Sequence, residues 1–234
     1  MNTKIFCDIA DISTIKKFNK KIIVKGFTTN PSLIRKAGAK DYKSYSKRIL
    51  KVCKNKPVSF EVFADEKAAM IRQAKQLASW GDNVYVKIPV TNTHGESMTS
   101  VIKELHSTGI KVNITAVMTD EQVRDVRLAL TSGVPAVISI FAGRIADAGI
   151  DPLPIMQRAA DALDDMEATE LLWASPREIL NVIQAQASGC DIITMTADLW
   201  RKLDLLGKPL AQYSLETVQM FYSDAQHAGF DLEA

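Results

Sequence analysis

One lysine interrupts a segment that is otherwise almost entirely apolar. Lys87 lies within VYVKIPV (84–90), and the carboxylates Asp8 and Glu61 interrupt two similar segments, IFCDIA (5–10) and VSFEVFA (58–64). A buried ammonium loses hydration, which favours the neutral amine, and a neutral amine is a nucleophile towards carbonyl carbons. These residues indicate Schiff-base chemistry of the class I aldolase type, with Lys87 as nucleophile and the two carboxylates as proton-transfer groups. The structural alternative is a buried Lys–Glu pair that braces neighbouring strands.

Other polar side chains interrupt the apolar segments in the same way. Within each segment the polar residues share one parity, so they point to the same face of that strand. We therefore expect one polar wall, because a strand buried on both faces should be nearly all apolar. A single Ser or Thr in a strand is more commonly a satisfied structural hydroxyl. The remaining members of the set are Thr28, Asn30, Ser59, Asn113, Thr115 and Ser139.

The elements that must position these residues alternate along the chain. Short β-branched runs are separated by amphipathic stretches in which apolar residues recur at helical spacing, as in Met98, Val101, Ile102 and Leu105. Eight strand–helix units favour a closed (β/α)8 TIM barrel, an α/β fold. A doubly wound open sheet would normally show a glycine-rich turn after its first strand, and none follows Asp8. The predicted strands are 5–10, 23–30, 58–64, 84–90, 111–117, 136–143, 170–175 and 191–197.

A single domain is predicted for residues 1–234, because no linker interrupts the pattern. The barrel takes about residues 1–207, and an additional C-terminal helix over about 213–228 lies outside the barrel count. That helix presents a largely apolar stripe that must pack somewhere.

Composition narrows the functional classes. The chain has 47% hydrophobic and 24% charged residues, which excludes intrinsic disorder and a disulfide scaffold. No apolar run approaches the ~20 residues that span a bilayer, so no membrane partner is expected. With no signal-peptide core, three scattered cysteines and no clustered histidines, we expect a cytoplasmic protein without a metal site.

The charge is distributed unevenly. Residues 1–56 hold 15 Lys/Arg against 3 Asp, although the net charge of the whole chain is only +2. These lysines are scattered among apolar residues, as on solvated helix faces, and no nucleic-acid recognition motif accompanies them. No nucleic-acid partner is expected.

Five motifs, in order along essentially the whole chain, resemble those of the transaldolase family. The resemblance is to its short, barrel-only branch, which also contains the fructose-6-phosphate aldolases. The motifs are FTTNPSLI (27–34), VYVKIPVT (84–91), NITAVMT (113–119), ISIFAGRIAD (138–147) and WASPRE (173–178).

The resemblance implies catalytic roles for four residues. Lys87 would form the Schiff base with C2 of a ketose phosphate, and Asp8 would move the proton of the C4 hydroxyl during carbon–carbon cleavage. Glu61 and Thr115 would hold the catalytic water. No metal or organic cofactor is implied, because the lysine supplies the electron sink.

The same resemblance implies a substrate-binding set. Asn30, Asn113 and Ser139 would hold the hydroxyls of the three-carbon dihydroxyacetone unit, and Arg144, Ser175 and Arg177 would bind phosphate. A guanidinium fork suits a phosphate group. Pro176 stands where the family has an aromatic residue, and Ser175 could instead be only an N-cap and Arg177 only a surface arginine. Thr29 and Phe141 complete the predicted set.

Within the family that this chain resembles, the residues at two positions distinguish the enzymes that transfer the three-carbon unit from those that release it. Fructose-6-phosphate aldolases carry Gln and Tyr where this chain has Glu61 and Phe141. A phenol can protonate the enamine that cleavage leaves, whereas phenylalanine cannot, so the enamine waits for an aldehyde acceptor. The resemblance therefore implies a transaldolase of the pentose phosphate pathway, acting on phosphorylated ketoses and aldoses such as sedoheptulose 7-phosphate and glyceraldehyde 3-phosphate. The alternatives are a fructose-6-phosphate aldolase and a non-catalytic sugar-phosphate-binding barrel.

Assembly is also implied by the resemblance. In the short branch the C-terminal helix reaches a neighbouring subunit, which predicts a homo-oligomer, either a pentamer or a decamer. The alternative is that the helix folds back and closes the bottom of its own barrel.

Overall fold

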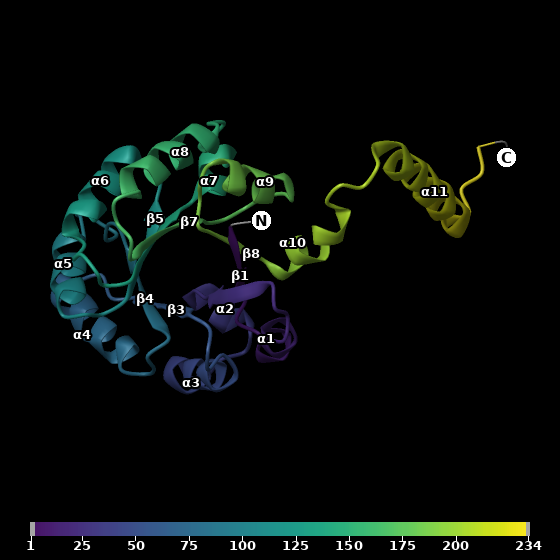
Figure 1. Ribbon diagram of the computed structural model, residues 1–234. Helices are drawn as coiled ribbons and strands as arrows, with labels where there is room; N and C mark the ends of the chain where they lie inside the picture. Colours follow the sequence, from purple (N-terminus) through teal and green to yellow (C-terminus); the bar gives the residue numbers. More distant parts are fainter. Residues whose placement is uncertain (1–2, 233–234) are drawn as a thin grey trace. The chain divides into compact units, whose positions relative to one another are not determined.

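Eight parallel strands close into a barrel in the computed structural model, which describes residues 3–232. Each strand pairs with its neighbours in sequence, and β8 pairs with β1 to complete the ring (Figure 1). The predicted (β/α)8 fold is confirmed. The strands are β1 (Lys4–Asp8), β2 (Val24–Thr28), β3 (Val58–Glu61), β4 (Val84–Pro89), β5 (Val112–Val117), β6 (Ala136–Ile140), β7 (Thr169–Trp173) and β8 (Ile192–Met195).

Helices follow every strand and surround the barrel. Two helices follow β2 and two follow β6, and polar side chains begin several of them. Thr119 and Gln122, for example, form a reciprocal capping box at the start of α6. The helices of the barrel are α1 (Ile12–Asn19), α2 (Pro31–Lys36), α3 (Tyr42–Val52), α4 (Lys67–Ala78), α5 (Thr99–Ser107), α6 (Asp120–Ala129), α7 (Ala142–Asp147), α8 (Pro152–Leu163), α9 (Leu180–Ala187) and α10 (Ala197–Arg201).

An apolar layer lies inside the barrel. Phe6, Val137, Leu172 and Ile192 form a buried cluster with Ala174, and Tyr85 and Phe141 pack against it. Gly26 is required beside this layer, because a Cβ there would lie 2.5 Å from the Phe6 ring. On β1, β6 and β8 the next inward-facing residues are the polar Asp8, Ser139 and Thr194, so on these strands the apolar layer forms the floor of the candidate site.

Residues Met1–Trp200 and Arg201–Ala234 form two separate compact units. The second unit contains a short 3-10 helix, η1 (Leu203–Leu205), and the long helix α11 (Leu210–Ala228). Helix α11 begins earlier than the predicted 213, and none of its side chains is buried within the second unit. Its exposed apolar residues include Leu215, Val218, Met220, Phe221 and Tyr222. The extent of a single domain over 1–234 stays a prediction.

Among residues 3–232, no helix combines the length and the hydropathy that crossing a bilayer requires.

Candidate active site

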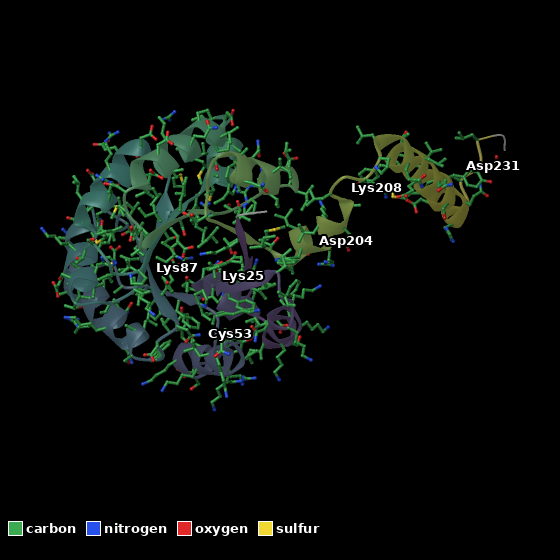
Figure 2. The ribbon with its side chains drawn as sticks, in the orientation of Figure 1. Lys25, Cys53, Lys87, Asp204, Lys208 and Asp231 are labelled. Atoms are coloured by element: carbon green, nitrogen blue, oxygen red, sulfur yellow. The ribbon has the colours of Figure 1, made fainter. Side chains whose placement is uncertain are left out.

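Lys87 lies on β4 inside the barrel, within the ring of helices (Figure 2). Its side chain is 9% exposed, and its Nζ lies 3.1 Å from Glu61 Oε2 on the neighbouring strand. The same Nζ donates a hydrogen bond of 3.1 Å to the backbone carbonyl of Thr29. The lysine is therefore held at a fixed point in the lumen, with a carboxylate in place to take its proton.

Asp8 lies at the end of β1, directly opposite Thr28 in the ladder. The Thr28 hydroxyl donates a 2.8 Å hydrogen bond to Asp8 Oδ1. Burial raises the pKa of Asp8 and the negative charge of Glu61 adds to the rise, while the positive charge of Lys87 and the Thr28 hydrogen bond oppose it. The net rise makes Asp8 able to hold a proton nearer neutral pH than an exposed carboxyl, which suits a group that must both accept and return one.

Asn113 lies at the centre of a hydrogen-bonded row across three strands. Its Nδ2 donates to Ser59 Oγ at 3.0 Å, and its Oδ1 accepts from Ser139 Oγ at 2.7 Å. All three side chains are buried. The row fixes which way the amide points, so the site presents defined hydrogen-bonding groups rather than mobile ones.

The Thr115 hydroxyl is buried and has no hydrogen-bond partner among residues 3–232. The chain bends next to it, because Ala116 has φ 62° and the register between β5 and β6 shifts between Ile114 and Val117. A buried hydroxyl without a partner is unfavourable by about 1–3 kcal/mol. Thr115 is therefore free to bond a water molecule or a substrate.

Thr29 and Asn30 have structural hydrogen bonds of their own. Thr29 Oγ1 donates to the carbonyl of Ser59 at 2.8 Å, and Asn30 Oδ1 accepts from the N–H of Leu33 at 2.9 Å, capping α2. Thr29 contributes its backbone carbonyl to Lys87, and Asn30 keeps its amide nitrogen for another partner.

Phe141, Arg144 and Ser175 come together where α7 meets the segment after β7. The Arg144 guanidinium lies 5.5 Å from the centroid of the Phe141 ring. Gly143 packs so closely on Ser175 that a Cβ at position 143 would lie 1.6 Å from the Ser175 carbonyl oxygen. Ser175 has φ 61°, and α9 begins only at Leu180, so the N-cap alternative for Ser175 is wrong.

Arg177 is near this group but already has a carboxylate partner. Its Nε lies 2.9 Å from Asp147 Oδ1, and its Nη2 lies 2.5 Å from Asp147 Oδ2. Both side chains are about half exposed. The guanidinium lowers the pKa of Asp147. Any phosphate at Arg177 would have to share the guanidinium with Asp147 or displace that carboxylate.

Two contributors were missing from the residues predicted from sequence. The Tyr42 hydroxyl accepts from the backbone N–H of Glu61 at 3.2 Å and donates to its carbonyl at 3.3 Å, which fixes the end of β3. The Thr194 hydroxyl on β8 lies 2.6 Å from that of Thr28. Thr194 interrupts an apolar run and could have been found by the argument used for Thr115, whereas Tyr42 begins a helix and gave no such signal.

Within the part of the chain that the structure describes, no group of three His, Cys, Asp or Glu residues is placed to hold a metal ion. The cysteines Cys7, Cys53 and Cys190 are buried and unbridged. Burial raises the pKa of the Cys53 and Cys190 thiols to about 12, so neither thiol is a ready nucleophile or ligand.

Solved structures with similar folds are distant in sequence. A crystal structure of inosine 5′-monophosphate dehydrogenase from Legionella pneumophila matches with a TM-score of 0.57 at 13% identity, over 84% of this chain and 58% of that chain. A crystal structure of a putative phosphonomutase from Burkholderia cenocepacia J2315 matches with a TM-score of 0.54 at 9% identity, over 97% of this chain and 93% of that chain. At such identities these matches show the fold alone.

Relatives in sequence are far more similar. A "Probable transaldolase" of Nitrosopumilus maritimus strain SCM1 is 36% identical over 215 residues, 91% of either chain. A "Probable transaldolase" of Thermoanaerobacter sp. strain X514 is 32% identical over 230 residues, which are 98% of this chain and 100% of that one. The model of the Transaldolase/Fructose-6-phosphate aldolase family matches residues 5–234. This chain therefore belongs to the transaldolase/fructose-6-phosphate aldolase family.

Proposed function

We propose that this protein is a transaldolase that transfers a dihydroxyacetone unit from a ketose phosphate to an aldose phosphate through a Schiff base on Lys87. The donor would be sedoheptulose 7-phosphate or fructose 6-phosphate, and the acceptor an aldose phosphate such as glyceraldehyde 3-phosphate. Family membership and the names of the relatives support a transaldolase-type enzyme. The observation that carries the mechanism is the position of Lys87 Nζ, 3.1 Å from Glu61 Oε2 in a lumen that also holds Asp8.

The first half-reaction begins with a proton transfer. Glu61 takes a proton from the Lys87 ammonium, and the neutral amine attacks C2 of the ketose. Glu61 and Thr115 hold a water molecule that returns protons as the carbinolamine loses its oxygen as water, leaving an iminium ion. Asn113 and Ser139 hold the hydroxyls of the three-carbon unit, and their row of hydrogen bonds to Ser59 keeps them aligned.

Cleavage and transfer then depend on Asp8. The Asp8 carboxylate takes the proton of the C4 hydroxyl, and the C3–C4 bond breaks. The electron pair of that bond moves into the iminium, which gives an enamine and a free aldehyde. An acceptor aldehyde replaces the one that leaves. The enamine attacks it, Asp8 returns a proton to the new hydroxyl, and hydrolysis of the iminium releases the product and Lys87. The raised pKa of Asp8 matches a group that takes and returns a proton in each cycle.

The choice between transfer and simple cleavage rests on Phe141. Its ring packs on the apolar layer and lies against Arg144, so no side-chain proton donor comes from this position. Without a donor there, the enamine persists until an acceptor binds. The aldolase reaction, which would release free dihydroxyacetone, is the competing function within the same family.

The phosphate group is assigned to Arg144, Ser175 and Arg177, around the start of α7. The close packing of Gly143 on Ser175 brings the start of α7 and the segment after β7 together. The αL conformation of Ser175 is uncommon for a residue other than glycine, and such strain clusters at ligand-binding sites.

We further propose a cytoplasmic homo-oligomer, a pentamer or decamer, that works in the pentose phosphate pathway. The support for assembly is α11, whose large apolar residues find no cover within the second unit.

The test is to trap the Schiff base. Borohydride reduction in the presence of fructose 6-phosphate should add a three-carbon or six-carbon mass to the peptide that contains Lys87. Lys87→Met should be folded, unlabelled and inactive. The matched control is Lys56→Met, since Lys56 is a half-buried lysine whose Nζ bonds the carbonyls of Asn19 and Lys21. Label on another lysine, together with an active Lys87→Met, would exclude the mechanism, and absence of any label would favour a non-catalytic sugar-phosphate-binding barrel.

A further inference from the structure

Thr194 is a buried hydroxyl in the barrel lumen that the mechanism above does not use. It lies on β8 opposite Phe6 of β1 and is 5% exposed. Its Oγ1 is 2.6 Å from Oγ1 of Thr28, a residue 166 positions away in sequence. The contact therefore exists only because β8 closes the barrel against β1, and Asp8 lies on the strand between the two threonines.

Proton counting fixes the direction of this contact when Asp8 is ionised. A threonine hydroxyl has one proton to donate, and Thr28 donates its proton to Asp8 Oδ1 at 2.8 Å. Thr194 must then donate to Thr28. The result is a chain of two hydrogen bonds, from Thr194 to Thr28 and from Thr28 to the Asp8 carboxylate.

The surroundings offer few competing partners for these two hydrogen bonds. Phe6 and Ile192, both buried, belong to the apolar layer beneath these bonds, so water does not reach the hydroxyls from below. The charged groups that act on Asp8 are Lys87 on β4 and Glu61 on β3, which lie on the side of the lumen away from β8. The uncharged donor that holds one oxygen of the carboxylate is therefore Thr28, and Thr194 stands behind it as the donor to Thr28.

We propose that Thr194 is a positioning residue for proton transfer, acting through Thr28 to orient Asp8 and to favour its ionised form. This inference rests on the proposed role of Asp8 in carbon–carbon bond cleavage. A hydrogen bond to a charged acceptor is stronger than one between neutral groups, and a second donor behind it polarises the first and strengthens it further. The other oxygen of Asp8 remains available for the substrate hydroxyl.

Removing the hydroxyl should act on the reaction rather than on binding. Thr194→Val keeps the β-branched shape but cannot donate, so the Asp8 carboxylate loses part of its stabilisation and its pKa rises. The acid limb of the kcat–pH profile should move to higher pH by about half to one pH unit, because one hydrogen bond changes an equilibrium by about threefold to tenfold. At pH values on the acid limb kcat should fall by a similar factor, while KM for fructose 6-phosphate stays within about twofold.

Two variants separate this role from a structural one. Thr194→Ser keeps the hydroxyl and should restore the wild-type pH profile. Thr169→Val makes the same substitution at a buried threonine at the start of β7, far from Asp8 in the register, and should leave the profile unchanged. An unshifted profile in Thr194→Val, or a loss of activity that Thr194→Ser fails to restore, would overturn the inference.

A measurement without turnover keeps the two proposals distinct. With 13C-labelled aspartate, the carboxyl resonance of Asp8, identified by its loss in Asp8→Asn, reports the ionisation of Asp8 directly. Its titration should move to higher pH in Thr194→Val and not in Thr194→Ser. If the wild type forms no Schiff base, the proposed function fails while this titration still supports or overturns the link between Thr194 and Asp8.

Discussion

Replacing Gly143 by alanine should damage phosphate binding while leaving the chemistry of Lys87 in place. Gly143 is the second residue of α7, and its Cα faces the backbone carbonyl of Ser175. A Cβ at this position would lie 1.6 Å from that oxygen and 2.7 Å from the carbonyl carbon. Since non-bonded heavy atoms settle more than 3 Å apart, the two segments must separate by on the order of 1.5 Å.

This displacement would move the residues that are assigned to phosphate binding. Ser175 is already in the αL conformation, so it has few alternative conformations, and Arg144 directly follows Gly143. A shift of about 1 Å in a positioned group can cost on the order of 10²-fold in rate, and loss of one charge-assisted contact about tenfold or more in binding. We expect the half-saturating concentration of fructose 6-phosphate to rise at least tenfold.

The assay is borohydride inactivation as a function of ligand concentration, with fructose 6-phosphate and with free dihydroxyacetone. Dihydroxyacetone has no phosphate, so its half-saturating concentration should change less than about threefold, as expected when no charge-assisted contact is lost. Overpacking destabilises by about 1–3 kcal/mol, so folding is checked by thermal unfolding.

The matched control is Gly81→Ala, where the nearest atom to a Cβ is Asn83 Oδ1 at 3.1 Å, the end of a side chain. It should bind both ligands as the wild type does. If folded Gly143→Ala responds to both ligands as the wild type does, the phosphate is not bound between α7 and Ser175.

Four further experiments test other parts of the molecule. Phe141→Tyr should release dihydroxyacetone from fructose 6-phosphate about 10²-fold faster when no acceptor is present, because a phenol can protonate the enamine; a wild type that already releases it as fast as it transfers it is an aldolase. Arg144→Ala should raise KM about 10- to 150-fold for fructose 6-phosphate but not for dihydroxyacetone, and equal effects would remove Arg144 from the phosphate site. A chain ending at Pro209 should be smaller by light scattering than the full-length oligomer, since it lacks the exposed apolar stripe of α11, and a monomeric full-length protein would refute the proposed assembly. His106 is fully buried, its Nδ1 accepts from the Thr131 N–H at 2.8 Å, and burial lowers its pKa, so the fold keeps it neutral while the unfolded chain protonates below about pH 6.5. The contribution of neutral His106 to stability is therefore present above that pH and lost as pH falls. Urea unfolding should show a smaller drop in the free energy of unfolding between pH 7.5 and 5.5 in His106→Asn, which can still accept from Thr131, than in wild type. Equal drops would contradict this prediction.

Strand positions were predictable because they depend on local alternation. All eight predicted strands overlap observed ones, yet most were predicted to run past the observed C-terminal end, as for 58–64 against Val58–Glu61. At those ends the chain leaves the ladder to form the loops that carry the site. A β-branched or apolar residue just after a strand looks the same in sequence as one inside it.

The inward-facing polar residues were also predictable in part. Shared parity placed Lys87, Glu61 and Asn113 on one face, and the structure brings them into one lumen. The alternation did not show that Thr29 would bind Lys87 through its backbone, nor that Arg177 would pair with Asp147. Such contacts depend on where a loop turns after its strand, which the pattern of side-chain types does not encode.

The sequence by itself determined the barrel, because periodicity is a property of neighbouring residues, and its motifs identified the family. Tertiary structure alone decided which groups meet across the lumen. Thr28 and Thr194 come within 2.6 Å because the registers of β1 with β2 and of β1 with β8 together set their heights. Gly143 meets Ser175 because α7 and the segment after β7 converge. Closing a barrel fixes the stagger of all its strands together, so no single strand carries that information.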